Sequence, residues 1–241
     1  MTPEDVREDV QRLVAPHNAA VPLTSRHIDA VAHQVICEMA LAARPPSLRK
    51  EADQNLTAST STYKLPADFF LPITVRVLAG SQWGNVGKVT QEELDQALPN
   101  WPNETSSGDV LHYYETGVYT TNDADYGKRQ IVLWPTPAQT VTNGLRVRYL
   151  RRPSKFSELP TDQSEIVDID SAHHFGIVYR TAWRILQAQG VKAVKVLDAY
   201  EGMWASALSN LKTHHSEEWL ADYEPQVRAF RGAGVDRSFN R

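Results

Sequence analysis

The sequence predicts an α+β fold, in which helices from the two ends of the chain pack together and the stretch between them forms a mainly antiparallel β module. Apolar residues recur at spacings of three and four near both ends, which is typical of amphipathic helices. In the middle of the chain the spacing changes to two, the period of a half-buried strand. Helices that flank a run of strands indicate α+β rather than a parallel α/β sheet.

Changes in period and composition divide the chain into four segments. Residues 1–48 form N-terminal helices, and residues 49–153 form the β module with a short inserted helix. Residues 154–224 form a helical hairpin followed by a short helix, and residues 225–241 form an extended C-terminal arm. We expect the first and third segments to build one helical domain, because each has an apolar stripe to bury.

The N-terminal segment contains start and stop signals for two helices. Thr2-Pro3-Glu4-Asp5 combines a capping side chain, a first-turn proline and early acidic residues, and the helix is expected to end near Val14. Thr24 or Ser25 caps a second helix with a stronger apolar stripe. Arg44-Pro45-Pro46 ends it, because the residue before a proline is disfavoured in the α region.

The β module alternates between apolar and polar residues over several short runs. Gly80–Lys88 is predicted to be a surface loop because it contains three glycines, and it fails the phosphate-loop pattern at Gln82 and Val89. Thr90 and Glu93 then form a capping box for a short helix over residues 91–98. Strands are predicted at Thr60–Leu65, Ile73–Leu78, Val110–Tyr114, Gln130–Trp134 and Leu145–Leu150.

A helical hairpin is predicted from Asp168 to Leu211. Asp170 or Ser171 caps its first helix, which runs to about residue 187, and Gly190 ends that helix. The second helix is expected to end near Leu211, with a separate short helix around residues 217–223. Neither apolar stripe contains a paired acid and base or a cluster of ligands, so the hairpin is interpreted as scaffold.

The composition is that of an ordinary globular protein, with 41% hydrophobic and 22% charged residues. The net charge of −4 gives no overall basic field that would attract nucleic acid. Cys37 is the single cysteine, which rules out an internal disulfide and fits a reducing cytosolic setting. We expect no secretory signal and no membrane span, because the N-terminus lacks the signal pattern and no apolar run is long enough.

No cofactor or metal is expected. His173-His174 and His214-His215 are adjacent pairs, and neighbouring helical side chains point about 100° apart, so neither pair shares one ion readily. Asp123 and Asp125 near Gly127 lack the remaining ligands of a calcium loop. The chain also has no nucleophile elbow, and no catalytic residues are predicted.

Two groups of residues are candidates for contacts with partners. One is a basic strip at the end of the last strand, which either contacts phosphate or an acidic surface, or is simply a solvated sheet face. The other is the C-terminal arm, which is either a tail without a core of its own or a segment that orders on docking. The strip comprises Arg146, Arg148, Arg151 and Arg152, and the arm residues are Arg228, Phe230, Arg231, Arg237, Phe239 and Arg241.

Two other classes of function stay open on residue chemistry alone. A small hydrolase would use His112 or His173 with nearby carboxylates, which requires those side chains to converge in one pocket. A nucleic-acid-binding module would use the arginine strip, and its affinity would fall steeply with salt.

An ordered set of short motifs resembles the head-to-tail adaptor, or connector, proteins of tailed bacteriophages. The motifs lie between about Asp53 and Leu211 and occur in the family's order. They are Tyr63-Lys64-Leu65-Pro66-Ala67-Asp68-Phe69 followed by Val75-Arg76-Val77, then Ile131-Val132-Leu133-Trp134-Pro135-Thr136-Pro137, then Leu145-Arg146-Val147-Arg148-Tyr149-Leu150-Arg151-Arg152-Pro153, and finally Asp168-Ile169-Asp170-Ser171-Ala172-His173-His174 leading into Ile177–Ala182.

The resemblance implies a structural, non-enzymatic virion protein at the head–tail interface, present in the host cytoplasm during assembly. Such subunits form a ring, commonly of twelve copies, that binds beneath the portal protein and above a tail or nozzle protein. The genomic DNA would pass through the ring without specific binding, and a mildly acidic subunit would repel it. By analogy, residues 225–241 are the candidate portal-docking arm. Residues 1–50 are less covered by the resemblance.

Overall fold

The computed structural model contains two compact units, each described here by itself. Unit 1 comprises residues 1–48 and 153–241, and unit 2 comprises residues 49–152. The structure describes residues 1–17, 23–97, 101, 107–117, 129–161, 164–166, 168–191 and 194–232. The predicted α+β class is confirmed: helices from both ends of the chain pack together, and a mostly antiparallel sheet forms between them in sequence.

The two N-terminal helices begin at the predicted caps. Helix α1 (Pro3–Val14) has a reciprocal capping box, because Asp5 N–H donates to Thr2 Oγ1 at 3.2 Å and Thr2 N–H donates to Asp5 Oδ2 at 2.7 Å. Helix α2 (Ser25–Ala43) is capped by Thr24, whose hydroxyl accepts from His27 N–H. It ends where Arg44 takes a left-handed conformation with φ of 50°.

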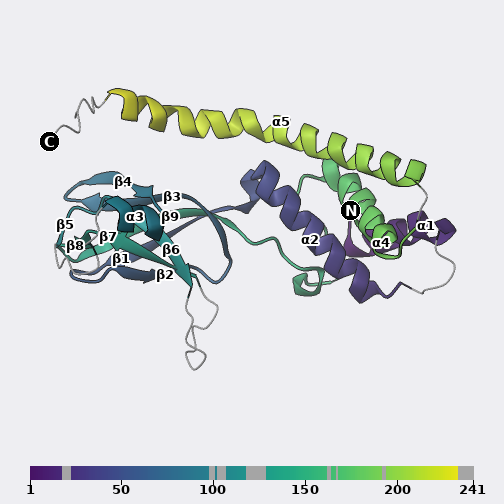
Figure 1. The fold of residues 1–241 in the computed structure, drawn as a ribbon, viewed down its shortest axis with the longest axis horizontal. Helices are drawn as coiled ribbons and strands as arrows, with labels where there is room; N and C mark the ends of the chain where they lie inside the picture. Colours follow the sequence, from purple (N-terminus) through teal and green to yellow (C-terminus); the bar gives the residue numbers. More distant parts are fainter. Residues whose placement is uncertain are drawn as a thin grey trace. The chain divides into compact units, whose positions relative to one another are not determined.

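The C-terminal hairpin is confirmed, but its second helix is longer than predicted. A 3₁₀ turn (Ser171–His173) capped by Asp170 leads into α4 (His174–Ala188), and α5 (Val194–Gly232) follows as one helix of 39 residues. Three predictions were therefore wrong. The second helix does not end near Leu211, no separate short helix follows it in the described residues, and the chain directly after residue 224 is helical rather than extended. Figure 1 shows α5 continuing past the helices that it packs against.

The reason for the longer helix is the weakness of the expected stop signal. No glycine or proline interrupts residues 203–224, and each further helical residue adds one backbone hydrogen bond once the helix is nucleated. The hydroxyl of Thr213 is satisfied inside the helix by the carbonyl of Ser209 at 3.0 Å. Pro225 also lies within α5, although proline lacks the N–H that donates to the carbonyl one turn earlier.

Unit 1 is built around α4, which packs against α1, α2 and α5. The closest approach is at Gly176, where an added Cβ would lie 2.6 Å from the Cβ of Ala207 and 3.7 Å from Cε of Met39. Glycine is therefore required at the crossing of α4 and α5. The largest fully buried side chains of this core are Ile28, Ile36, Met39, Ile169, Ile177, Ile185 and Leu186.

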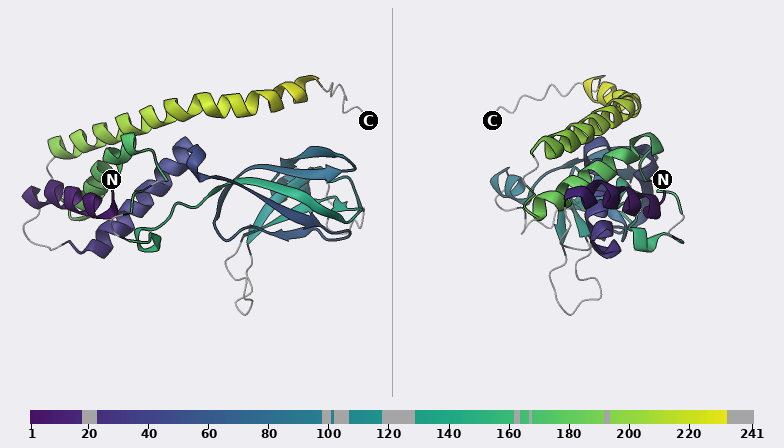
Figure 2. Two further views of the ribbon diagram at one scale, coloured as in Figure 1. Left: turned by 180° about the vertical axis from the view of Figure 1, so that it is seen from behind. Right: turned by 90° about the vertical axis from the view of Figure 1, so that its right-hand side faces the viewer.

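Unit 2 is a seven-stranded curled sheet, seen from two further directions in Figure 2. The strand order is β1-β9-β3-β4-β6-β7-β2, and every pair is antiparallel except β4–β6. Strands β5 and β8 form a separate two-stranded parallel ribbon. The bounds are β1 (Arg49–Leu56), β2 (Thr62–Lys64), β3 (Phe69–Ala79), β4 (Gln82–Lys88), α3 (Gln91–Ala97), β5 (Ser107–Gly108), β6 (His112–Gly117), β7 (Arg129–Trp134), β8 (Thr136–Pro137) and β9 (Val141–Arg151).

The sheet curls until its two edge strands approach each other. Gln54 on β1 donates from Nε2 to the carbonyl oxygen of Lys64 on β2 at 2.7 Å, which links the two edges. The inner face is apolar, with Leu145, Val147 and Tyr149 of β9 among its buried residues. The predicted strand is therefore confirmed, with burial alternating from Leu145 to Tyr149 and Leu150 buried as well.

The predicted loop at Gly80–Lys88 was wrong, because most of it is strand β4. Gly80, with φ of 61°, and Ser81 form a two-residue turn, after which Gln82 pairs with Ala79 and Val86 with Val75. The glycines misled the prediction. Their low strand propensity is outweighed by the hydrogen bonds that β4 makes with β3. The capping box of α3 is confirmed, with Thr90 N–H 2.7 Å from Glu93 Oε2.

The helix crossing gives a direct test of the fold. Gly176→Ala is expected to destabilise unit 1 by about 1–3 kcal/mol, because the methyl group overlaps Ala207. The matched control is Gly202→Ala on α5, where an added Cβ meets nothing within 4 Å. The control should stabilise by about 0.5–1 kcal/mol through helix propensity. Hydrogen exchange in α4 and α5 measures both effects, and equal effects of the two variants would contradict the crossing.

Candidate functional site

The outer face of unit 2 carries a polar row that crosses four strands. Asp53, Arg146, Arg76 and Asn85 are register partners on β1, β9, β3 and β4 respectively. Arg146 makes a bidentate contact with Asp53, at 2.8 Å from Nε and 2.9 Å from Nη2. Arg76 donates from Nε to Asn85 Oδ1 at 2.9 Å. These contacts join the strands across the face opposite the apolar core.

Arg146 is the centre of this row. Its Nε also lies 3.2 Å from Glu51, and its guanidinium stacks 4.5 Å from the ring centroid of Trp83. Its hydrogen bond to Asp53 lowers the pKa of that carboxyl group below the ordinary value of 3.8. The same hydrogen bond raises the pKa of Arg146. Arg146 is therefore held in a fixed geometry by its own unit.

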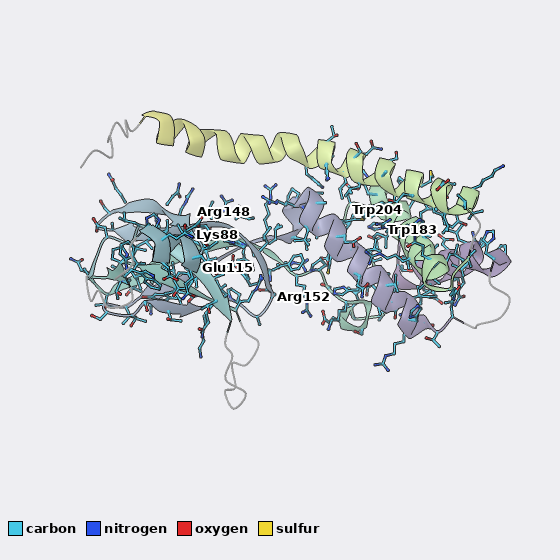
Figure 3. All side chains as sticks on the ribbon, in the orientation of Figure 1. Lys88, Glu115, Arg148, Arg152, Trp183 and Trp204 are labelled. Atoms are coloured by element: carbon cyan, nitrogen blue, oxygen red, sulfur yellow. The ribbon has the colours of Figure 1, made fainter. Side chains whose placement is uncertain are left out.

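The four arginines of the predicted strip do not form one uniform surface. Arg146 and Arg148 share the outer face, and Arg148 Nε lies 3.5 Å from Glu51. Arg151 ends β9 and donates to the carbonyl oxygen of Arg152 at 3.4 Å. Arg152 is exposed, and its backbone N–H donates to Asp68 O at 2.6 Å. Figure 3 labels Arg148 and Arg152 within unit 2.

Because Arg146 and Arg148 already face carboxylates, a phosphate would have to displace Glu51 or Asp53 to bind them. The geometry therefore favours a protein contact over a nucleic-acid contact at this face. A protein surface can extend the existing row of ion pairs without breaking it.

The predicted arm lies at and beyond the end of α5. Arg228, Phe230 and Arg231 belong to this helix, whose side chains the structure describes as far as residue 215. Arg237, Phe239 and Arg241 lie outside the described residues.

The two histidines of the hydrolase alternative lie in different units. His112 lies in unit 2, where it stacks on Trp134 with ring centroids 6.2 Å apart, and His173 lies in unit 1, where it interacts electrostatically with Asp170. Among the described residues, no group of three or more His, Cys, Asp or Glu side chains has an arrangement that holds a metal ion.

Sequence reasoning missed that the two histidine pairs lie near each other. Asp170 interacts electrostatically with His173, His214 and His215. The 3₁₀ turn before α4 therefore lies close to the middle of α5. Burial lowers the pKa values of His173 and His174 below 6.5. The Nε2 atom of His174 is 2.8 Å from the carbonyl oxygen of Ile169, which orients the buried ring.

An arginine–tryptophan cluster on unit 1 was also missed. The guanidinium of Arg180 lies 4.3 Å from the ring centroid of Trp183 and 5.4 Å from that of Trp204, on neighbouring helices (Figure 3). It also pairs with Glu201 and lies 4.0 Å from Glu38. The cluster ties α2, α4 and α5 together, and only the spacing of Arg180, Trp183 and Arg184 along one helix hinted at it.

Within the described parts of the chain, the helices lack the combination of length and apolar sequence that a membrane crossing requires.

A comparison with protein families identifies the chain. The model of the SU10 adaptor protein family matches residues 1–228, which covers nearly the whole chain and both units. The chain therefore belongs to the SU10 adaptor protein family, a family of phage head–tail adaptors. This is a structural protein family, and the predicted resemblance is confirmed at that level. No curated protein matches the chain.

The polar row predicts a measurable pH effect. In Arg146→Met, the pKa of Asp53 should rise toward 3.8, because the hydrogen bond that lowers it is lost. The stabilisation from this pair is full above pH 3.8 and disappears as the pH falls through the lowered pKa of the folded state. NMR titration of the Asp53 carboxyl carbon measures this shift.

Arg148→Met is the matched control, because Arg148 lies 3.5 Å from the carboxylate of Glu51 and does not form the bidentate pair with Asp53. An Asp53 pKa that is the same in Arg146→Met and in the unaltered protein would show that the bidentate pair does not form in solution.

Proposed function

We propose that the protein is a head-to-tail adaptor whose copies form a ring joining the portal to the tail around the DNA channel. The observation that carries this proposal is the adaptor-family match across residues 1–228. The match covers residues of both units, which supports a role for both in the adaptor. The family implies binding to other virion proteins, and the portal and a tail-side protein are the partners we infer.

The arrangement of contacts supports a structural rather than a catalytic role. Polar clusters on both units are occupied by interactions that join helices or strands, such as Arg180 with Glu201 and Arg146 with Asp53. Such clusters hold a surface in a fixed shape, which a subunit of a ring requires. We infer a non-enzymatic protein, present in the virion and in the host cytoplasm during assembly, with twelve copies in the ring.

The net charge of −4 fits a ring through which DNA passes. Duplex DNA carries about one negative charge per 1.7 Å of helix axis, so a net basic channel would retain it and a mildly acidic one would let it slide. The arginines of the outer sheet face do not oppose this inference, because two of them are matched by Glu51 and Asp53.

Two surfaces are proposed for partner contacts. The end of α5 and the residues after it, including Arg228, Phe230 and Arg231, dock the portal, because α5 extends beyond its packing partners (Figure 1). Aromatic and arginine side chains are the residues most often central to an interface. The outer sheet face around Arg148 and Arg152 contacts a neighbouring subunit.

The first test is the mass of the purified protein in solution, alone and mixed with its cognate portal ring. We expect a monomer alone and a stoichiometric complex of high mass with portal, because the portal would template the ring. A protein that stays monomeric when it is mixed with the portal ring at micromolar concentration would refute the adaptor proposal.

A second test removes the arm. Truncation after Glu224 should leave folding unchanged within about 0.5 kcal/mol, because the last buried side chain described on α5 is His215. Portal binding should be abolished, as measured by interferometry with an immobilised portal ring. The matched control is truncation after Gly232, which keeps the helix; portal binding that survives both truncations contradicts the docking role.

A further inference from the structure

Four histidines of unit 1 gather where the start of α4 meets α5. His173 ends the 3₁₀ turn before α4, His174 begins α4, and His214 and His215 lie on α5. The ring centroids of His214 and His215 are 5.0 Å apart, and His214 interacts electrostatically with His173. Asp170, which caps the 3₁₀ turn, lies close enough to interact with both segments. The cluster therefore joins two parts of the chain that are distant in the sequence.

Three of the four histidine side chains are buried. Their exposed fractions are 8% for His173, 2% for His174 and 7% for His215. The ordinary pKa of histidine is 6.5, so such a ring gains a positive charge close to neutral pH. A buried charge costs free energy unless a partner compensates it. The stability of this contact therefore depends on the protonation of its rings.

The hydrogen bonding of His174 shows that the fold accepts its neutral form. Its Nε2 atom lies 2.8 Å from the carbonyl oxygen of Ile169, and because a carbonyl oxygen only accepts, Nε2 carries the hydrogen. The other nitrogen, Nδ1, is buried without a hydrogen-bond partner among the described residues, and the same holds for Nδ1 of His173. A charged ring turns both nitrogens into donors, which leaves a buried donor unsatisfied. The backbone of Ile166 also favours a charge on His174, but burial outweighs both backbone contacts.

The nearby carboxylates do not compensate a charge on these rings. Asp170 attracts a charge on His173 and on His174, but its side chain is exposed, so water and salt screen the attraction. Asp168 belongs to the same segment and is buried, but its Oδ2 accepts from Ser154 N–H at 2.7 Å. Neither carboxylate forms a direct ion pair with an imidazole in the described part of unit 1.

Two basic groups add to the cost of charging the rings. His214 on α5 opposes a charge on His173, and the amino group of Met1 opposes a charge on His174. Burial is the largest cause at both positions, and it lowers the pKa of both rings below 6.5. At neutral pH the two rings are therefore uncharged and can pack together.

We propose that the four histidines form an acid-sensitive latch that holds the middle of α5 against the 3₁₀ turn before α4. When the rings are neutral, the two segments pack. When each ring takes up a proton from solvent, the charges repel one another and draw water in, so this part of α5 separates. The crossing at Gly176 and Ala207 stays closed, because its contacts are apolar. The inference goes beyond the proposed adaptor function and does not depend on it.

Opening of the latch changes how far α5 is held by its own unit. The last buried side chain described on α5 is that of His215, and the helix continues to Gly232. Release at the latch leaves the crossing near Ala207 as the last contact described for α5. A helical segment without packing is marginally stable in water, so the released part unwinds more often.

The direction of the pH effect follows from proton linkage. A histidine whose pKa is lower in the folded than in the unfolded protein contributes its full stability above pH 6.5. That contribution is lost as the pH falls from 6.5 through the lowered pKa of the folded state. The pKa of Asp170 is lowered from 3.8, so its titration begins only at more acidic pH. A comparison of about pH 7.5 with about pH 5.5 therefore isolates the histidines.

Hydrogen exchange of the full chain tests the latch, after correction for the intrinsic effect of pH on exchange. Protection of the amides of residues 208–215 should fall on the order of tenfold from about pH 7.5 to about pH 5.5. Protection of residues 177–186 in α4 should change less than about twofold. Unchanged protection of residues 208–215, or an equal loss in both segments, overturns the proposal.

A variant that cannot be protonated identifies the ring responsible. His174→Gln keeps an N–H donor for the Ile169 carbonyl oxygen, and the loss of protection should shrink from about tenfold to about threefold, because His173 still titrates. The matched control is His27→Gln on the exposed face of α2, which should keep the full loss. The same pH response in His174→Gln as in the unaltered protein contradicts the role of His174.

NMR titration of the histidine rings needs no variant and decides the matter if His174→Gln does not fold. The His173 and His174 rings should titrate with midpoints below pH 6.5. The amide signals of residues 208–215 should shift with the same midpoints. Midpoints at or above pH 6.5 for both rings would overturn the latch.

Discussion

The packing of α4 against three other helices is the constraint on which unit 1 depends. Its partners α1 and α2 come from the beginning of the chain and α5 from the end, so α4 joins segments separated by the whole β unit. The crossing with α5 requires Gly176, because the backbones approach too closely for a larger side chain. Each fully buried isoleucine, such as Ile177 and Ile185, contributes about 1.5–3 kcal/mol, which offsets the entropy of closing so long a loop.

The two faces of the sheet in unit 2 are stabilised by different kinds of contact. The inner face is closed by apolar side chains, whereas the outer face is held by a row of cross-strand polar contacts centred on Arg146. Because these contacts are satisfied within the unit, the outer face is shaped before any partner arrives. An adaptor that binds other virion proteins gains from such preformed surfaces, since less side-chain entropy is lost on binding.

Membership of the adaptor family implies binding to other virion proteins. Under the proposed function, the outer sheet face and the end of α5 serve as two separate contact surfaces. The geometry of each is suited to association rather than to chemistry.

Local signals in the sequence determined much of the fold. Three helices began where predicted, because each cap forms between residues three positions apart. The capping residues are Thr2 with Asp5, Thr24 with His27, and Thr90 with Glu93. Period-two alternation likewise placed β9 and put Arg146 and Arg148 on one face. These features depend on neighbours in sequence, which is why pattern alone was sufficient.

Only the tertiary structure decided the remaining features, because each depends on contacts between distant residues. Strand β4 forms despite its glycines since β3 pairs with it, and α5 continues past Leu211 since no glycine or proline interrupts residues 203–224 of a helix already held by packing. The pairing of Arg146 with Asp53 joins residues 93 positions apart, and β4 pairs with β6 at Gly87 and Lys88 although a helix and a short strand separate them in the sequence. A sequence pattern reports which face a residue occupies, but the partner on that face is chosen by the fold.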